Sequence, residues 1–140
     1  MTTAYDPQNI FAKILRGEAP AHKVAEDEAA FAFMDIMPRA DGHVLVIPKA
    51  PARNLFDIAP EALAAAMPLV KRVAVAARRA MGADGVTVLQ ANEGAGGQVV
   101  FHLHIHVLPR WDGVPLRAPG AMGDPAKLAA DAERIRAALD

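Results

Sequence analysis

The chain has 140 residues, of which 53% are hydrophobic and 22% charged. This length and composition are typical of one folded domain, so we expect a single domain over residues 1–140. The formal net charge of -1 argues against long nucleic acids or anionic membranes as partners. The chain contains no cysteine, which excludes disulfides and thiolate catalysis and leaves His, Asp and Glu as the strong metal ligands.

The first residues of the chain show no targeting signal. Residues 1–7 lack a basic region followed by an apolar stretch, and no apolar run approaches the length of a membrane span. We therefore expect a cytoplasmic protein.

The first third of the chain predicts a short helix, a β-hairpin and a further strand. Apolar residues at helical spacing and a glycine stop indicate a helix over residues 9–17. Two short apolar-rich segments, residues 23–26 and 29–35, are separated by acidic residues and predict two paired strands. Residues 43–48 are rich in β-branched side chains and predict a third strand, with His43 at its start.

One long helix is predicted over residues 60–81, where apolar residues recur at spacings of three and four and Gly82 follows as a stop. Pro68 lies inside it and predicts a bend, at a cost of about 3 kcal/mol unless a kink is accommodated. Residues 85–90 predict a fourth strand and residues 99–109 a fifth.

A terminal amphipathic helix is predicted over residues 124–139, because Asp124 is a good N-cap and Pro125 suits the first helical position. Most neighbouring strands are joined by short turns and only one long helix intervenes. The sequence therefore predicts an α+β fold: a mainly antiparallel five-stranded sheet with one long helix and shorter terminal helices.

Three histidines, His102, His104 and His106, alternate with apolar residues on the fifth predicted strand. Alternate residues of a strand share one face, so all three imidazoles should project from the same side of the sheet. The residues between them, which should point into the core, are Leu103, Ile105 and Val107. Packing alone does not explain three neighbouring imidazoles, because each buried ring needs a polar partner. We interpret them as a functional site.

Two kinds of chemistry suit this site. A His-x-His pair on a strand can present two nitrogens to a zinc ion, although three alternate residues span roughly 13 Å and one ion cannot easily bind all three. The second possibility is nucleophilic catalysis, in which the central imidazole attacks an electrophile such as phosphorus. The glycine-rich turn at residues 92–98 favours the second possibility, because such turns can aim several backbone N–H groups at one anion.

Residues 97–108 closely resemble the signature of the histidine triad (HIT) superfamily, in which three histidines alternate with apolar residues and two further apolar residues follow. Other segments resemble the matching family segments in the same order. These are residues 10–20, 35–38, 42–49 and 92–94. The resemblance covers roughly residues 9–111 and implies the HIT fold.

The resemblance also implies an enzyme. His104 would attack the α-phosphorus of a nucleotide and form a nucleotidyl-histidine that water then hydrolyses, while His106 would bind phosphate and assist the leaving group. His102 and His43 would orient His104 and hold its tautomer. Neutral imidazole has a reference pKa near 6.5 and is a good nucleophile, so this chemistry requires no metal and no cofactor.

The implied substrate is a purine nucleotide or nucleotide conjugate, whose leaving group stays open between an amine, an acyl group and a polyphosphate. Asp35 would contact the ribose, Asn92 and Gln98 the phosphate and ribose, and Phe33 and Ile36 the base. The alternative function is that of a nucleotide-binding interaction protein with incidental hydrolysis.

Some positions depart from the family pattern. Members with a structural zinc have cysteines where this chain has Asn9 and Ala12, and a histidine where it has Pro51, so we expect no structural zinc. Val99 replaces the serine that assists a leaving amine in purine phosphoramidases, which argues against a preference for phosphoramidates. Family members usually form homodimers that pair their long helices and extend the sheet, and the small residues of the 60–81 helix would permit this close approach.

Overall fold

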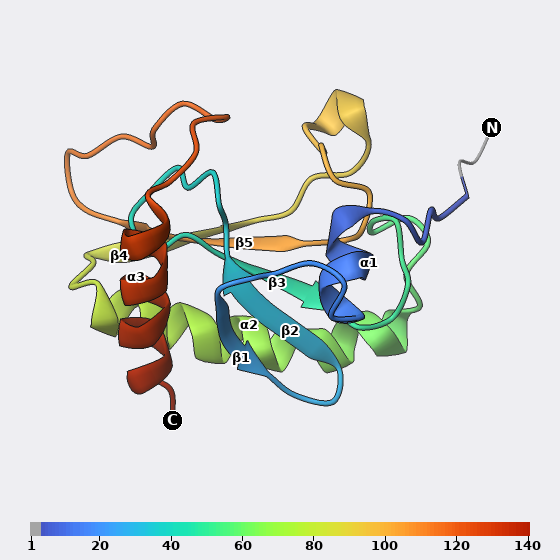
Figure 1. Ribbon diagram of the computed structural model, residues 1–140, viewed down its shortest axis with the longest axis horizontal. Coiled ribbons are helices and arrows are strands. Elements are labelled where there is room, and N and C mark those ends of the chain that lie inside the picture. The colour runs from blue at the N-terminus through green and yellow to red at the C-terminus, as the bar shows by residue number, and fades with distance from the viewer. Residues whose placement is uncertain (1–3) are drawn as a thin grey trace.

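The computed structural model, which describes residues 4–140, is built on a five-stranded antiparallel sheet (Figure 1). Its strand order is β1-β2-β3-β5-β4. The strands are β1 (Lys23–Glu26), β2 (Ala30–Met34), β3 (Val44–Pro48), β4 (Gly85–Leu89) and β5 (Ile105–Arg110). The helices are α1 (Ile10–Leu15), α2 (Pro60–Ala80) and α3 (Pro125–Ala137), and a short 3-10 turn spans Gly94–Gly96. The predicted α+β fold class is confirmed.

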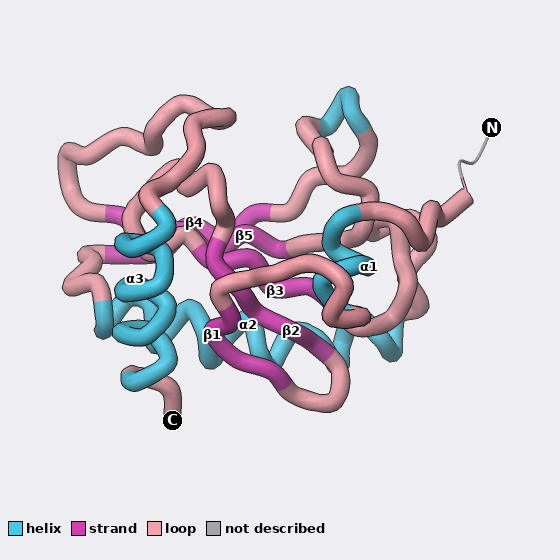
Figure 2. The backbone as a smooth tube through the Cα atoms, viewed as in Figure 1, coloured by secondary structure: helices cyan, strands magenta, loops and turns pink. Residues whose placement is uncertain are grey.

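The two faces of the sheet are covered differently. Both α2 and α3 pack on one face and form the main core with it, whereas the short α1 lies on the opposite face (Figures 1 and 2). β3 shows the division clearly, because Val44 and Val46 belong to the core under α2 while Leu45 and Ile47 pack with Phe11 of α1. Alternation of side chains along a strand produces this two-sided pattern.

The long helix α2 buries one apolar stripe against the sheet and continues through Pro68. Its buried residues are Ala66, Leu69, Val70, Val73, Ala76 and Ala77. Both terminal helices begin at side-chain caps: Asn9 Oδ1 accepts from the N–H of Ala12 in α1, and the Asp124 carboxylate accepts from the N–H of Ala126 in α3.

The fifth strand is shorter than predicted, because β5 begins at Ile105 and not at residue 99. Before that point the chain pairs with a loop: the N–H of Leu103 donates to the carbonyl of Ala52, beyond the end of β3. His102 and His104 therefore precede the strand. The predicted alternation nevertheless survives, since the intervening apolar residues, Leu103, Ile105 and Val107, all lie in the main core.

The prediction of a single domain over residues 1–140 includes residues 1–3, which lie outside those described, and it stays a prediction. Within residues 4–140, no helix combines the length and the apolar character needed to cross a bilayer.

The turn before β3 depends on Gly42, the residue that precedes His43. Its φ is +79°, and a Cβ there would lie 2.7 Å from Met81 Cγ and 3.2 Å from Pro109 Cγ. Gly17 has nearly the same φ, +77°, but open space around it. Gly42→Ala should therefore lower the free energy of unfolding by about 3 kcal/mol and Gly17→Ala by only about 1 kcal/mol, measured by urea denaturation. Equal losses would show that the contacts at Gly42 do not matter.

Candidate active site

The four predicted histidines converge on the α1 side of the sheet. His43 lies just before β3, His106 lies in the adjacent strand β5, and His102 and His104 lie in the segment that leads into β5. The ring centroids of His104 and His106 are 5.0 Å apart, and those of His43 and His106 are 5.2 Å apart. His102 is completely buried and His104 is 8% exposed, so the rings must find hydrogen-bond partners within the protein.

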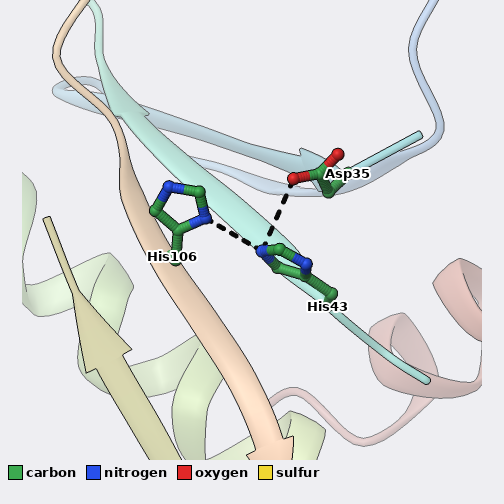
Figure 3. Close-up of side chains that lie close together, drawn as sticks. All are labelled: Asp35, His43 and His106. Atoms are coloured by element: carbon green, nitrogen blue, oxygen red, sulfur yellow. Dashed lines mark hydrogen bonds and ion pairs between the residues drawn. The ribbon is translucent and has the colours of Figure 1, made fainter. Parts of the chain in front are cut away.

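Hydrogen bonds determine where His43 and His106 carry their protons. The backbone N–H of Arg39 donates to His43 Nδ1 at 3.1 Å, so the proton of neutral His43 is on Nε2. This Nε2 lies 2.9 Å from His106 Nδ1 and 3.5 Å from the carboxylate of Asp35 (Figure 3). His106 Nδ1 therefore accepts, and its proton is on Nε2.

The same reasoning defines the reactive nitrogen of His104. Its Nδ1 lies 2.8 Å from the carbonyl oxygen of His102, and a carbonyl can only accept, so Nδ1 carries the proton. Nε2 is therefore unprotonated and carries a lone pair. Phe11 packs edge-on against the ring, with centroids 5.0 Å apart. His104 thus has the tautomer that a nucleophilic imidazole requires.

His102 is held at both ring nitrogens. Its Nε2 donates to the carbonyl of Pro48 at 2.8 Å, and its Nδ1 accepts from the hydroxyl of Tyr5 at 2.6 Å. No sequence pattern singled out Tyr5, which lies 97 residues away from His102 along the chain. Only the fold brings the two together.

Burial keeps the imidazoles uncharged. It lowers the pKa of His43 to about 3, with a further contribution from His106, and it lowers the pKa of His106 to about 4, with a further contribution from His104. Burial also lowers the pKa values of His102 and His104. A cluster of neutral rings suits nucleophilic attack, because a protonated His104 would have no lone pair to offer.

Three further predicted residues belong to β2 or directly follow it. Asp35 follows β2, its Oδ1 accepts from the N–H of Met37, and burial raises the pKa of its carboxyl. Phe33 is buried against Phe11, with ring centroids 5.3 Å apart. Ile36 is 49% exposed and offers an apolar surface to solvent.

The side chain of Gln98 is buried and links two segments of the protein through hydrogen bonds. Its Oε1 accepts from Asn54 Nδ2 and from the N–H of Glu93, and its Nε2 donates to the carbonyls of Arg53 and Val100. Every polar atom of this buried side chain thus has a protein partner. These bonds join the glycine-rich turn to the loop after β3.

Asn92 also braces the turn, because its Oδ1 accepts from the N–H of Leu55 at 2.8 Å and its amide pairs with that of Gln90. Arg53 donates two hydrogen bonds of 2.8 Å to Glu93. Hydrogen bonds from Arg53 and Asn54 lower the pKa of Glu93 to about 2. The sequence did not single out Asn54, although it is buried at the centre of this network.

Comparison with known proteins supports one family. The HIT domain family matches residues 16–113. The chain is 43% identical over 107 residues to an adenosine 5'-monophosphoramidase of Saccharomyces cerevisiae, which covers 76% of this chain and 65% of that protein. It is 40% identical to an adenylylsulfatase of Arabidopsis thaliana, with 72% of this chain and 51% of that protein covered. The chain thus spans less than two thirds of either relative's length.

Solved structures agree with this assignment. A HIT-like protein from Bartonella henselae superimposes with a TM-score of 0.92 and 48% identity, covering 97% of this chain and 100% of that one. A zinc-bound histidine triad family protein from Mycobacterium smegmatis gives a TM-score of 0.84 and 38% identity, covering 94% and 93%. The chain belongs to the histidine triad family.

The residues at the family's structural zinc positions do not fit a zinc ion. Asn9 uses its side chain to cap α1, and Ala12 and Pro51 have no ligand atom. None of these three residue types supplies the nitrogen and sulfur ligands that zinc prefers.

A second set of potential ligands is the group of Asp35, His43 and His106, whose ligand atoms lie within 4.8 Å of one another. A metal on Nε2 of neutral His43 would require a proton on Nδ1, where the N–H of Arg39 already points. The Nδ1–H of His43 and the backbone N–H of Arg39, both hydrogen-bond donors, would then face each other. The hydrogen bonds of this group therefore suit a proton relay and do not fit a metal site.

The lowered pKa values predict that acid destabilises the protein. Below about pH 6.5 the unfolded chain binds protons on its histidines while the folded cluster does not, so the free energy of unfolding should fall by up to about 1.4 kcal/mol per pH unit for each neutral histidine. For His43 this loss should continue down to a pH of about 3.

Urea denaturation at about pH 7.5, 6 and 5 measures this slope. His43→Gln should reduce it, and His22→Gln is the matched control for the loss of a histidine outside the cluster. A His43→Gln slope equal to that of the wild type would contradict the prediction.

Proposed function

We propose that the protein transfers the nucleoside monophosphate group of a purine nucleotide conjugate to His104 and then to water. The fixed tautomer of His104 carries this proposal, because it leaves Nε2 free beside His106. The names of the two relatives, an adenosine 5'-monophosphoramidase and an adenylylsulfatase, support adenosine 5'-monophosphate as the transferred group.

In the first step the Nε2 lone pair of His104 forms a bond to the α-phosphorus, and the bond from phosphorus to the leaving group breaks. The leaving group departs with that electron pair. The Nε2–H of His106 is the proposed donor to it, or to a phosphate oxygen, while His43 donates to the other nitrogen of His106.

The resulting nucleotidyl-imidazolium still carries its Nδ1 proton, and the carbonyl dipole of His102 stabilises the positive charge. In the second step water attacks phosphorus, the bond from Nε2 to phosphorus breaks, and its electron pair returns to His104. The water proton passes to solvent, and the nucleoside monophosphate is released.

Substrate contacts are proposed for the surrounding residues. Asp35 is assigned to the ribose, and Phe33 and Ile36 to the base. Asn92 borders the phosphate region through the glycine-rich turn. For Gln98 we favour bracing this turn over the ligand contact predicted from sequence, because its polar atoms are already occupied.

The leaving group distinguishes possible substrates. Val99 is 83% exposed and presents only methyl groups where a serine would offer a hydroxyl, which favours leaving groups that need no donor at this position. Assays with adenosine and guanosine phosphoramidates, dinucleoside polyphosphates and nucleotidyl sulfates would rank the candidates. A cytoplasmic location stays a prediction.

His104→Ala should abolish turnover of every such substrate but retain nucleotide affinity, because other groups form the pocket. Mass spectrometry after rapid quenching should find the nucleotidyl mass on the wild type only, at His104. Label on another residue would overturn the assignment of the nucleophile. Binding without turnover by the wild type would favour the alternative function, a nucleotide-binding interaction protein.

A homodimer is proposed from the edge of the sheet. β4 is an end strand, and its side chains Val88 and Leu89 are at least one third exposed. On α2, Met67 and Val75 are also exposed, at 42% and 43%. An apolar helix face beside an unpaired strand edge suits a two-fold contact that continues the sheet.

The double variant Val75→Glu/Val88→Glu should be monomeric, because it places like charges, which cannot pair with each other, in the proposed interface. Sedimentation equilibrium measures the mass, and the wild type should have twice the mass of the variant. Met122→Glu, at a residue that is 65% exposed and lies outside β4 and α2, is the control for a surface charge elsewhere and should stay dimeric. A monomeric wild type would overturn the proposal.

A further inference from the structure

The carbonyl of His102 fixes the tautomer of His104, but no strand fixes that carbonyl. β5 begins only at Ile105, and among residues 4–140 a single backbone hydrogen bond, from Leu103 to Ala52, joins the residues just before it to a loop. Peptides outside a β-ladder can rotate unless side chains hold them. The orientation of the His102 carbonyl therefore depends on how the His102 side chain is anchored.

The anchor is a pair of hydrogen bonds to the His102 ring. The carbonyl of Pro48, the last residue of β3, accepts from Nε2 at 2.8 Å, and the hydroxyl of Tyr5 donates to Nδ1 at 2.6 Å. The rings of Tyr5 and His102 also meet edge-on, with centroids 5.6 Å apart. A neutral imidazole has one donor and one acceptor, and in the described part of the chain each has one partner.

We propose that Tyr5 is a positioning residue for the reaction: its hydroxyl locks the His102 ring and thereby the carbonyl that holds His104 in its reactive tautomer. This inference rests on the proposed function. Tyr5 does not act on the substrate itself, and its effect passes through His102.

The carbonyl of Pro48 can only accept a hydrogen bond, so Nε2 must carry the proton of His102. The other ring nitrogen, Nδ1, must then accept, and the Tyr5 hydroxyl is the donor that it needs. Without the Tyr5 hydroxyl, a completely buried acceptor has no protein partner and must recruit water or a proton. With water or a proton in place of the Tyr5 hydroxyl, the Nδ1 side of the His102 ring is no longer held by the protein. The His102 carbonyl is then less well fixed toward His104.

Tyr5→Phe removes the hydroxyl and keeps the aromatic contact. Loss of one such hydrogen bond should lower kcat about 10-fold while KM changes by less than about twofold, because nucleotide contacts are untouched. In the ligand-free protein, nitrogen NMR of the imidazoles should show a changed Nδ1 resonance for His102. Stability alone would not produce this combination.

Two controls separate positioning from stability. Asn9→Ala removes the cap of α1 in the same N-terminal region but leaves the Tyr5–His102 bond, so kcat should stay within about twofold of the wild type. The chain has one tyrosine, so growth on 3-fluorotyrosine changes position 5 alone and keeps its hydroxyl. This protein should retain wild-type kcat within about twofold.

Each outcome decides between the explanations. A Tyr5→Phe variant with an unchanged His102 resonance or a nearly unchanged kcat would overturn the role of Tyr5, as would an equal loss in Asn9→Ala. Absence of turnover by the wild type would instead overturn the proposed function, because the NMR measurement needs no substrate.

Discussion

The hydrogen bond from His104 Nδ1 to the carbonyl of His102 is the interaction on which the site depends. It leaves the lone pair of the second nitrogen directed away from the backbone and would stabilise a positive ring after attack. The late start of β5 makes this bond possible, because a carbonyl committed to the sheet would be a poorer partner for a neighbouring side chain. The irregular segment before the strand is therefore part of the chemistry.

The other imidazoles follow the same rule of one donor and one acceptor per ring. Arg39 and Pro48 supply the backbone groups that set the tautomers of His43 and His102. No buried side-chain nitrogen or oxygen among residues 4–140 lacks a partner, so the rings can stay neutral in a buried site. Backbone groups fix these tautomers more rigidly than solvent could.

Several kinds of local pattern predicted the strands and helices: helical spacing of apolar residues indicated α1 and α2, β-branched content indicated β3, and the N-cap and proline indicated α3. His43 was predicted as a site residue only from the resemblance to the HIT superfamily, whereas the alternation with apolar residues singled out His102, His104 and His106. The alternation of histidines with apolar residues placed the start of β5 six residues too early. This alternation continues through His102 and His104, although these two residues precede the strand. Tyr5 and Asn54 were missed because their partners are distant in sequence and hydrogen bonds leave no periodic signal.

The glycine-rich turn shows that the site is maintained at some cost in local stability. Glu93 has a φ of +63° and a ψ of 164°, a conformation that costs of order 1–3 kcal/mol for a residue other than glycine. Its carboxylate binds Arg53 and Asn54, and these side-chain contacts, which a glycine could not make, offset the strain. Its backbone N–H also donates to Gln98 Oε1. Because Gln98 also binds the carbonyl of Val100, this network links the turn to the chain that enters the histidine cluster. The turn and the imidazoles are thus held as one unit, in which the loop after β3 supplies the common support.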